Sequence, residues 1–177
     1  MIDKTTSEPR TCSTAYETDA NGLTHWTDTH ADAWIGLLET HKQLTRALDG
    51  ELIARHGLSL SALELLARLA VADDRQLQPT ALAAASGLSL SRVSRIIDAL
   101  EARELVTRVA CPSDARAVYA KLTGAGLALV IAAQSTHFAS VQAAFFDQLD
   151  ADEIATLARV FGKFASHARE ECDAGRP

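Results

Sequence analysis

Residues 79–101 carry the strongest structural signal in the sequence, two short helical segments separated by a tight turn. Pro79 suits the first turn of a helix, because its missing N–H would have no partner there, and Gly87 can end that helix. Ser89 then caps a second helix, in which apolar side chains recur every three or four residues. These side chains are Leu90, Val93, Ile97 and Leu100. The spacing predicts two short helices three residues apart.

Two β-favouring runs follow these helices. Leu105–Ala110 and Ala117–Leu122 are rich in Val, Tyr and Thr, and the segment between them holds the turn formers Pro, Ser and Asp, which predicts a hairpin. A helix pair followed by a hairpin is the arrangement of a winged helix-turn-helix, whose second helix enters the major groove of DNA. Donors near the start of that helix would reach base edges and phosphates. They are Ser89, Ser91, Arg92, Ser94 and Arg95.

Longer helical patterns flank this unit. Apolar positions recur with helical spacing up to Gly57, which predicts a long first helix. Ser59 or Ser61 caps the next helix, since Ser61 and Glu64 have the spacing of a capping box. The buried stripe of that helix is predicted to hold Leu63, Leu66, Leu69 and Ala70. After Gly124 the pattern is helical again. The predicted fold class is therefore mainly α, a winged helix-turn-helix with a small hairpin wing.

The sequence divides into three parts. Residues 1–29 are polar with little periodicity and predict a loosely ordered extension. Residues 30–170 form the predicted domain, in which Asp150 caps the last helix, and residues 171–177 are a tail.

Charge is distributed unevenly along the chain. The formal net charge is −6, which excludes a uniformly basic surface but not a basic patch. Residues 75–124 hold seven basic and four acidic side chains, a net charge of +3, so the remainder carries −9. Arginines on a lone amphipathic helix are usually a solvated face. Their coincidence with the helix pair and the hairpin favours nucleic-acid binding.

The segment ELVTRVACPSDARAVYAKLTGAG resembles the wing signature of the MarR family of bacterial transcriptional regulators. The matching residues are Arg108, Asp114, Arg116, Leu122, Thr123 and Gly126. The resemblance implies a homodimer that binds an inverted-repeat operator in double-stranded DNA, usually as a repressor released by a small ligand. It implies a DNA-binding lobe over about residues 58–123 and dimerisation helices over about 31–57 and 124–169.

The resemblance also assigns roles in the wing. Arg116 would enter the minor groove of DNA and Asp114 would orient it, although the same pair could simply staple the hairpin. Arg108 is a further candidate DNA contact. Two positions depart from the family pattern: Ala115 replaces a second arginine, and Glu104 replaces a glycine that ends the recognition helix. If position 104 needs a positive φ, Glu104 is strained.

The sequence leaves three mechanisms open by which the protein could be released from DNA. Trp34 and His41 lie seven residues apart, on one helical face, and could hold a small aromatic acid effector, although both are favoured as residues of the dimer core. Oxidation of Cys12 or Cys111 is a second alternative. Metal binding by histidines is the third, and solvated histidines are favoured over ligands. We predict no metal site and no cofactor.

Other classes of protein find little support in the sequence. It lacks the nucleophile-elbow, P-loop, zinc-protease and dinucleotide-binding motifs, so we do not expect an enzyme. No apolar run approaches the length of a membrane span and no secretory signal opens the chain, so we expect a cytoplasmic protein. A helical protein-interaction module without DNA binding is the remaining alternative.

Overall fold

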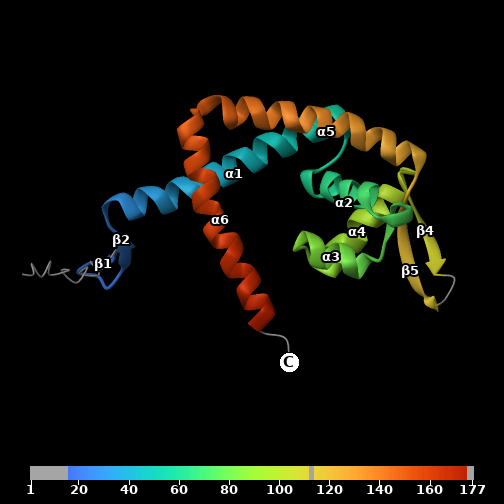
Figure 1. The fold of residues 1–177 in the computed structure, drawn as a ribbon, viewed down its shortest axis with the longest axis horizontal. Coiled ribbons are helices and arrows are strands. Elements are labelled where there is room, and N and C mark those ends of the chain that lie inside the picture. The colour runs from blue at the N-terminus through green and yellow to red at the C-terminus, as the bar shows by residue number, and fades with distance from the viewer. Residues whose placement is uncertain (1–15, 112–113, 175–177) are drawn as a thin grey trace, which may run out of the picture. The chain divides into compact units, whose positions relative to one another are not determined.

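The computed structural model describes residues 16–111 and 114–174 (Figure 1). Its contacts divide the chain into two units, residues 1–43 and 44–177. The first unit holds the strands β1 (Tyr16–Thr18) and β2 (Thr24–Trp26) and the start of the helix α1 (Asp28–His56). The second holds the end of α1 and all later elements.

The first unit contains a hairpin over residues 16–26, within the segment 1–29 that the sequence predicted as a loosely ordered extension; residues 1–15 lie outside the described part of the chain. β1 and β2 pair antiparallel, with Tyr16 opposite Trp26 and their ring centroids 5.9 Å apart. The Asp19 carboxylate accepts hydrogen bonds from the backbone N–H groups of Asn21 and Leu23, both at 2.9 Å. The bond from Leu23 is the main reason that the pKa of Asp19 lies below its ordinary value. The helix α1 also begins earlier than expected, at Asp28.

The second unit opens as the sequence predicted. Gly57 ends α1 in the left-handed region, with φ 61°, and Ser59 caps α2 (Leu60–Val71) by accepting a hydrogen bond from the Ala62 N–H at 3.1 Å. The alternative cap at Ser61 is wrong, because Ser61 lies inside the helix, and Glu64 pairs with Arg68. Leu63, Leu66 and Leu69 are buried, as predicted, and Ala70 is partly buried.

The predicted helix pair is confirmed. α3 (Pro79–Ser86) has Pro79 at its start and ends at Gly87, with φ 68°. α4 (Leu90–Glu101) is capped by the Ser89 hydroxyl, which accepts a hydrogen bond from the Arg92 N–H at 3.3 Å. The stripe of α4 that faces the core holds Val93, Ile97 and Leu100. Leu90, which the spacing also predicted in this stripe, is the first residue of the helix and is 47% exposed.

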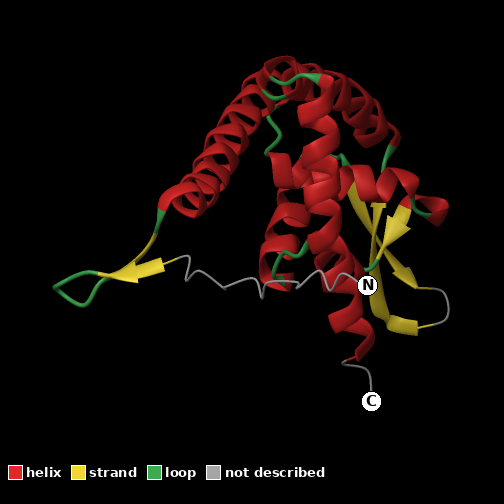
Figure 2. Ribbon diagram, turned by 60° about the vertical axis from the view of Figure 1, so that its left-hand side comes forward, coloured by secondary structure: helices red, strands yellow, loops and turns green. Residues whose placement is uncertain are grey.

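The hairpin is confirmed and gains a third strand. β4 (Val106–Cys111) and β5 (Asp114–Leu122) pair antiparallel, with a bulge between Ala110 and Cys111. A 3-10 turn (Asp73–Arg75) leads into β3 (Gln76–Leu77), which pairs with the other edge of β5 and gives the order β3-β5-β4. Figure 2 shows these strands beside the helices. The two-residue strand β3 is too short for a periodic signal in the sequence.

Helices complete the second unit. α5 (Gly124–Ala144) is capped by Thr123 and packs on α2, and a 3-10 turn (Phe146–Gln148) connects it to α6 (Ala151–Ala174). Asp150 caps α6 as predicted, accepting a hydrogen bond from the Glu153 N–H at 2.8 Å. The core joins α1, α2, α3, α4, the sheet and α5. Its largest fully buried side chains are Leu52, Leu58, Leu65, Leu66, Leu69, Leu82, Ile97, Val93, Val106 and Val130.

One segment of the described residues, 124–148, is long and apolar enough to cross a membrane by length and composition alone. The core helix of a globular domain passes the same test. Gly126, Val130 and Ala133 of this segment are buried within the second unit.

Glu104, three residues after the end of α4, has the backbone geometry anticipated for a glycine position. Glu104 has φ 58°, in the left-handed region that side chains with a Cβ rarely adopt. We expect Glu104→Gly to raise the free energy of unfolding by about 0.5–1 kcal/mol, because relief of strain exceeds the added entropy of the unfolded chain. Chemical denaturation measures the change. Glu104→Ala is the control, since it removes the charge and keeps the strain; equal gains in both variants would contradict the explanation.

Candidate nucleic-acid interface

The outward face of α4 carries the predicted donors. Ser91, Arg92 and Arg95 are exposed and Ser94 is partly buried, on the opposite side from the stripe that packs into the core. Ser89 is exposed at the N-terminal end of the helix, where its hydroxyl is used as a cap. The buried stripe fixes the helix, so that its arginines project from a rigid support.

Both arginines have only neutral partners among the described residues. Arg92 Nη2 donates to the Ser61 hydroxyl at 3.3 Å, and Arg95 Nε donates to the Ser91 carbonyl oxygen at 3.3 Å. Neither guanidinium pairs with a described carboxylate. Their positive charge is therefore available to an anion, and the fork of each guanidinium fits a guanine edge or a phosphate.

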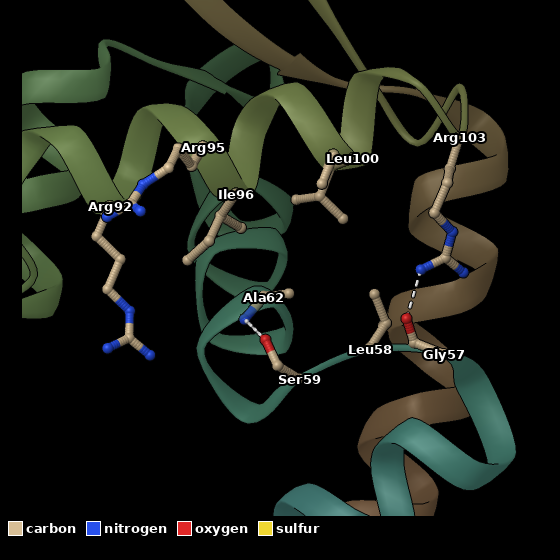
Figure 3. A pocket seen from close by; sticks show the side chains of 10 residues that line it. Gly57, Leu58, Ser59, Ala62, Arg92, Arg95, Ile96, Leu100 and Arg103 are labelled. Carbon is tan, nitrogen blue, oxygen red and sulfur yellow. Dashed lines mark hydrogen bonds between the residues drawn. The ribbon is translucent and has the colours of Figure 1, made fainter.

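A groove of about 500 Å³ lies between this face of α4 and the start of α2 (Figure 3). Figure 3 shows Arg92 and Arg95 toward one end of the groove and Arg103 at the other. The groove is lined by Gly57, Leu58, Ser59, Ala62, Arg92, Arg95, Ile96, Ala99, Leu100 and Arg103. None of these residues is acidic, so the groove adds to the positive potential beside the recognition helix.

Arg108 pairs with the acidic side chains of α4, on another side of the helix. Arg108 Nη2 lies 2.5 Å from Asp98 Oδ1, and Nη1 pairs with the Glu101 carboxylate. The hydrogen bond to Asp98 is the main reason that the pKa of Arg108 lies above its ordinary value. Arg108 thus ties the wing to α4 and neutralises the acidic side chains of that helix, and its predicted role as a DNA contact stays a prediction. A DNA contact by Arg108 would have to compete with these two pairs.

The wing residues Asp114 and Arg116 are described only as backbone. Both belong to β5, and Asp114 lies opposite Cys111 in the register of the hairpin. Their side chains, like that of Cys111, lie outside the described part of the structure, as does all of Cys12. The predicted pairing of Asp114 with Arg116 therefore stays a prediction.

Trp34 and His41 lie in the first unit, on α1, and both side chains are exposed. Trp34 is 49% exposed and stands among other half-exposed apolar side chains. These are Ile35, Leu37 and Leu38. Among the side chains that the structure describes, no three of His, Cys, Asp or Glu gather as a metal site.

Sequence reasoning missed Arg103 and Ser61. Arg103 follows α4 and donates to backbone carbonyl oxygens at the end of α1, some 46 residues earlier. Ser61 was considered only as a cap and instead holds Arg92. Neither role has a local signal, because each partner lies on a different helix.

The comparisons with known proteins agree with this geometry. The sequence model of the MarR family matches residues 56–117, from the end of α1 into the wing. A comparison with the sequences of curated proteins found no significant match.

Solved structures match over most of the chain. AbsC, a MarR family transcriptional regulator from Streptomyces coelicolor, is 31% identical, covers 82% of this chain and 99% of its own, and has a TM-score of 0.73. Sco3205, a regulator of the same family and organism solved in complex with DNA, is 28% identical, with coverages of 81% and 90% and a TM-score of 0.73. CouR from Rhodococcus jostii RHA1, solved with p-coumaroyl-CoA, is 21% identical, with coverages of 78% and 95% and a TM-score of 0.66, and shares the fold. Because AbsC is 31% identical over 82% of this chain, and the family model matches the segment from the end of α1 into the wing, the chain belongs to the MarR family of transcriptional regulators.

Proposed function

We propose that this protein is a homodimeric repressor that binds an inverted-repeat operator in the cytoplasm and is released from it by a small ligand. The observation that carries the proposal is the outward face of α4, where Arg92 and Arg95 are exposed and paired with no described carboxylate. Sco3205, which shares the fold and is 28% identical, has been solved in complex with DNA, and this supports DNA binding by the present chain.

The proposed DNA contacts combine the helix and the wing. Arg92 and Arg95 would read base edges or phosphates in the major groove, and Ser91 and Ser94 would fix the position of the helix. Arg116, oriented by Asp114, would reach the minor groove. The basic segment has a net charge of +3, so two copies would bring about +6 to the duplex.

Exposed apolar side chains support the proposed dimer. Large hydrophobic side chains are exposed on all three helices that the family resemblance assigns to dimerisation. Examples are Trp34 and Leu38 on α1, Ile131 and Phe138 on α5, and Phe161 and Phe164 on α6. A second copy that covers these faces would remove them from water, which is the usual driving force of a permanent dimer.

Salt dependence tests DNA binding. We expect the protein to shift a duplex from upstream of its own gene, and the logarithm of its affinity to fall linearly with the logarithm of salt, by about 0.9 for each phosphate neutralised. A mobility-shift titration across a salt series measures the slope. A helical protein-interaction module would show no detectable binding to that duplex, or binding whose affinity does not depend on salt. Either result would reject the proposal.

The same assay separates the switches. We favour an aromatic carboxylate as the effector, with Trp34 and His41 as candidate contacts; CouR, of the same fold, has been solved with the aromatic thioester p-coumaroyl-CoA. Phenolic acids should then dissociate the complex, and Trp34→Ala should weaken the response. If no aromatic acid releases the DNA, release by a zinc chelator would indicate regulation by a metal, and release by peroxide would indicate regulation by thiol oxidation.

A further inference from the structure

Arg103 connects the end of the recognition helix to the end of α1. Its Nη1 donates to the Gly57 carbonyl oxygen at 2.6 Å and its Nη2 donates to the His56 carbonyl oxygen at 3.1 Å. Figure 3 shows the first of these bonds at the end of the groove away from Arg92. Arg103 is thus committed to backbone acceptors, unlike the arginines at the other end of α4.

The chemistry at the end of α1 suits a guanidinium. The last carbonyl groups of a helix have no partner within the helix and carry partial negative charge. Gly57, with φ 61°, turns the chain there, and the two N–H groups of one guanidinium reach two successive carbonyl oxygens. A lysine at this position would offer a point charge without the fork.

The end of α1 is also tied to other helices of the second unit. His56 Nε2 lies 2.8 Å from the Thr136 hydroxyl of α5, and the Asp49 carboxylate accepts a hydrogen bond from the Leu60 N–H, at the start of α2, at 2.7 Å. Through Arg103 this junction reaches α4. One arginine therefore links the recognition helix by hydrogen bonds to α1, which is itself bonded to α5.

We propose that Arg103 is a positioning residue, which fixes the recognition helix relative to α1 and α5 and so sets the separation of the two recognition helices in the dimer. The inference rests on the proposed function, because only a dimer on an inverted repeat has such a separation to set. Half-sites of such operators lie about one helical turn apart, or a multiple of it, so a tilt of each helix changes which spacing fits.

The test compares full operators with single half-sites. Wild-type protein first selects its operator from a random duplex library. Arg103→Ala should then bind the full operator about ten-fold more weakly, a typical strength of coupling between two sites. Its affinity for a duplex with one half-site should stay within about two-fold, because Arg103 touches no DNA in this proposal. We also compare the selected operator with operators that have one base pair added or removed between the half-sites. The wild type should lose more affinity on this change of spacing than Arg103→Ala does.

Two further variants distinguish a positioning role of Arg103 from a general loss of structure. Arg103→Lys keeps the charge and one donor direction, so it should recover part of the full-operator affinity and part of the spacing preference. Arg46→Ala removes the same charge from an exposed site on α1 and should leave both unchanged. Assays run below the melting temperature measured for each variant.

The outcomes are distinguishable. An equal loss on half-site and full operator, or no loss on either, would overturn the positioning role of Arg103 while leaving DNA binding intact. A wild-type protein that selects no sequence would overturn the proposed function, and the positioning role with it.

Discussion

Arg95→Ala should weaken binding to the selected operator by about 10- to 100-fold, because one good arginine contact to a base pair discriminates by about 1–3 kcal/mol. Arg95 is exposed on the outward face of α4 and its Nε bonds only the Ser91 carbonyl oxygen. The substitution should therefore leave the melting temperature almost unchanged. A mobility-shift titration and a thermal melt of the same preparations measure both quantities.

A lysine variant shows what Arg95 contacts. Arg95→Lys keeps the charge but loses the fork that fits guanine O6 and N7. Recovery of full affinity in Arg95→Lys would assign the contact to a phosphate, whereas a loss close to that of alanine would assign it to a base. Arg116→Ala is the corresponding variant in the wing. Arg46→Ala serves again as the charge-matched control, and an equal loss there would show that net charge, not position, governs binding.

Gly126→Ala should lower the free energy of unfolding by about 3 kcal/mol, at the upper end of what overpacking a core costs. A methyl group at this position would overlap the Leu105 carbonyl oxygen and lie 2.7 Å from Leu122 Cδ1. The carbonyl group cannot easily move away, because it accepts a hydrogen bond from the Thr123 N–H at 3.1 Å. Helix α5 would have to separate from the base of the wing.

Gly124→Ala is the matched control for this prediction. Gly124 lies two residues earlier on the same helix, and a methyl group there would meet no atom within 4 Å. Alanine should be neutral or slightly stabilising at this position, since it favours helix over glycine. Urea denaturation of both variants measures the difference. Similar midpoints for the two variants would show that the contact between α5 and Leu105 is looser than the structure indicates.

The recognition helix could be predicted in detail because its signals are local. Gly87 ends one helix, Ser89 caps the next, and the spacing of Val93, Ile97 and Leu100 marks the buried stripe. The side that faces away, with Arg92 and Arg95, follows from the same period of 3.6 residues. The left-handed backbone of Glu104 could be anticipated only from the family resemblance, because that pattern has a glycine at this position.

The site was predicted less well wherever the partner is distant. The ion pairs of Arg108 had no signal in the sequence, because Asp98 and Glu101 approach it only when the wing folds back on α4. Arg103 gave no signal, because its acceptors belong to α1. The strand β3 was missed because two residues show no alternation, and its pairing with Lys121 and Ala120 exists only in the folded sheet.

The sequence by itself determined the helix pair, the wing, the caps and the outward position of Arg92 and Arg95, since each depends on residues within about one or two helical turns. Only the tertiary structure decided which arginines, among the described side chains, have no acidic partner and can bind an anion. It pairs Arg108 with the acids of α4, commits Arg103 to the end of α1, and leaves Arg92 and Arg95 with neutral partners. The physical reason is that an ion pair depends on distance in space, which the order of residues along the chain does not give.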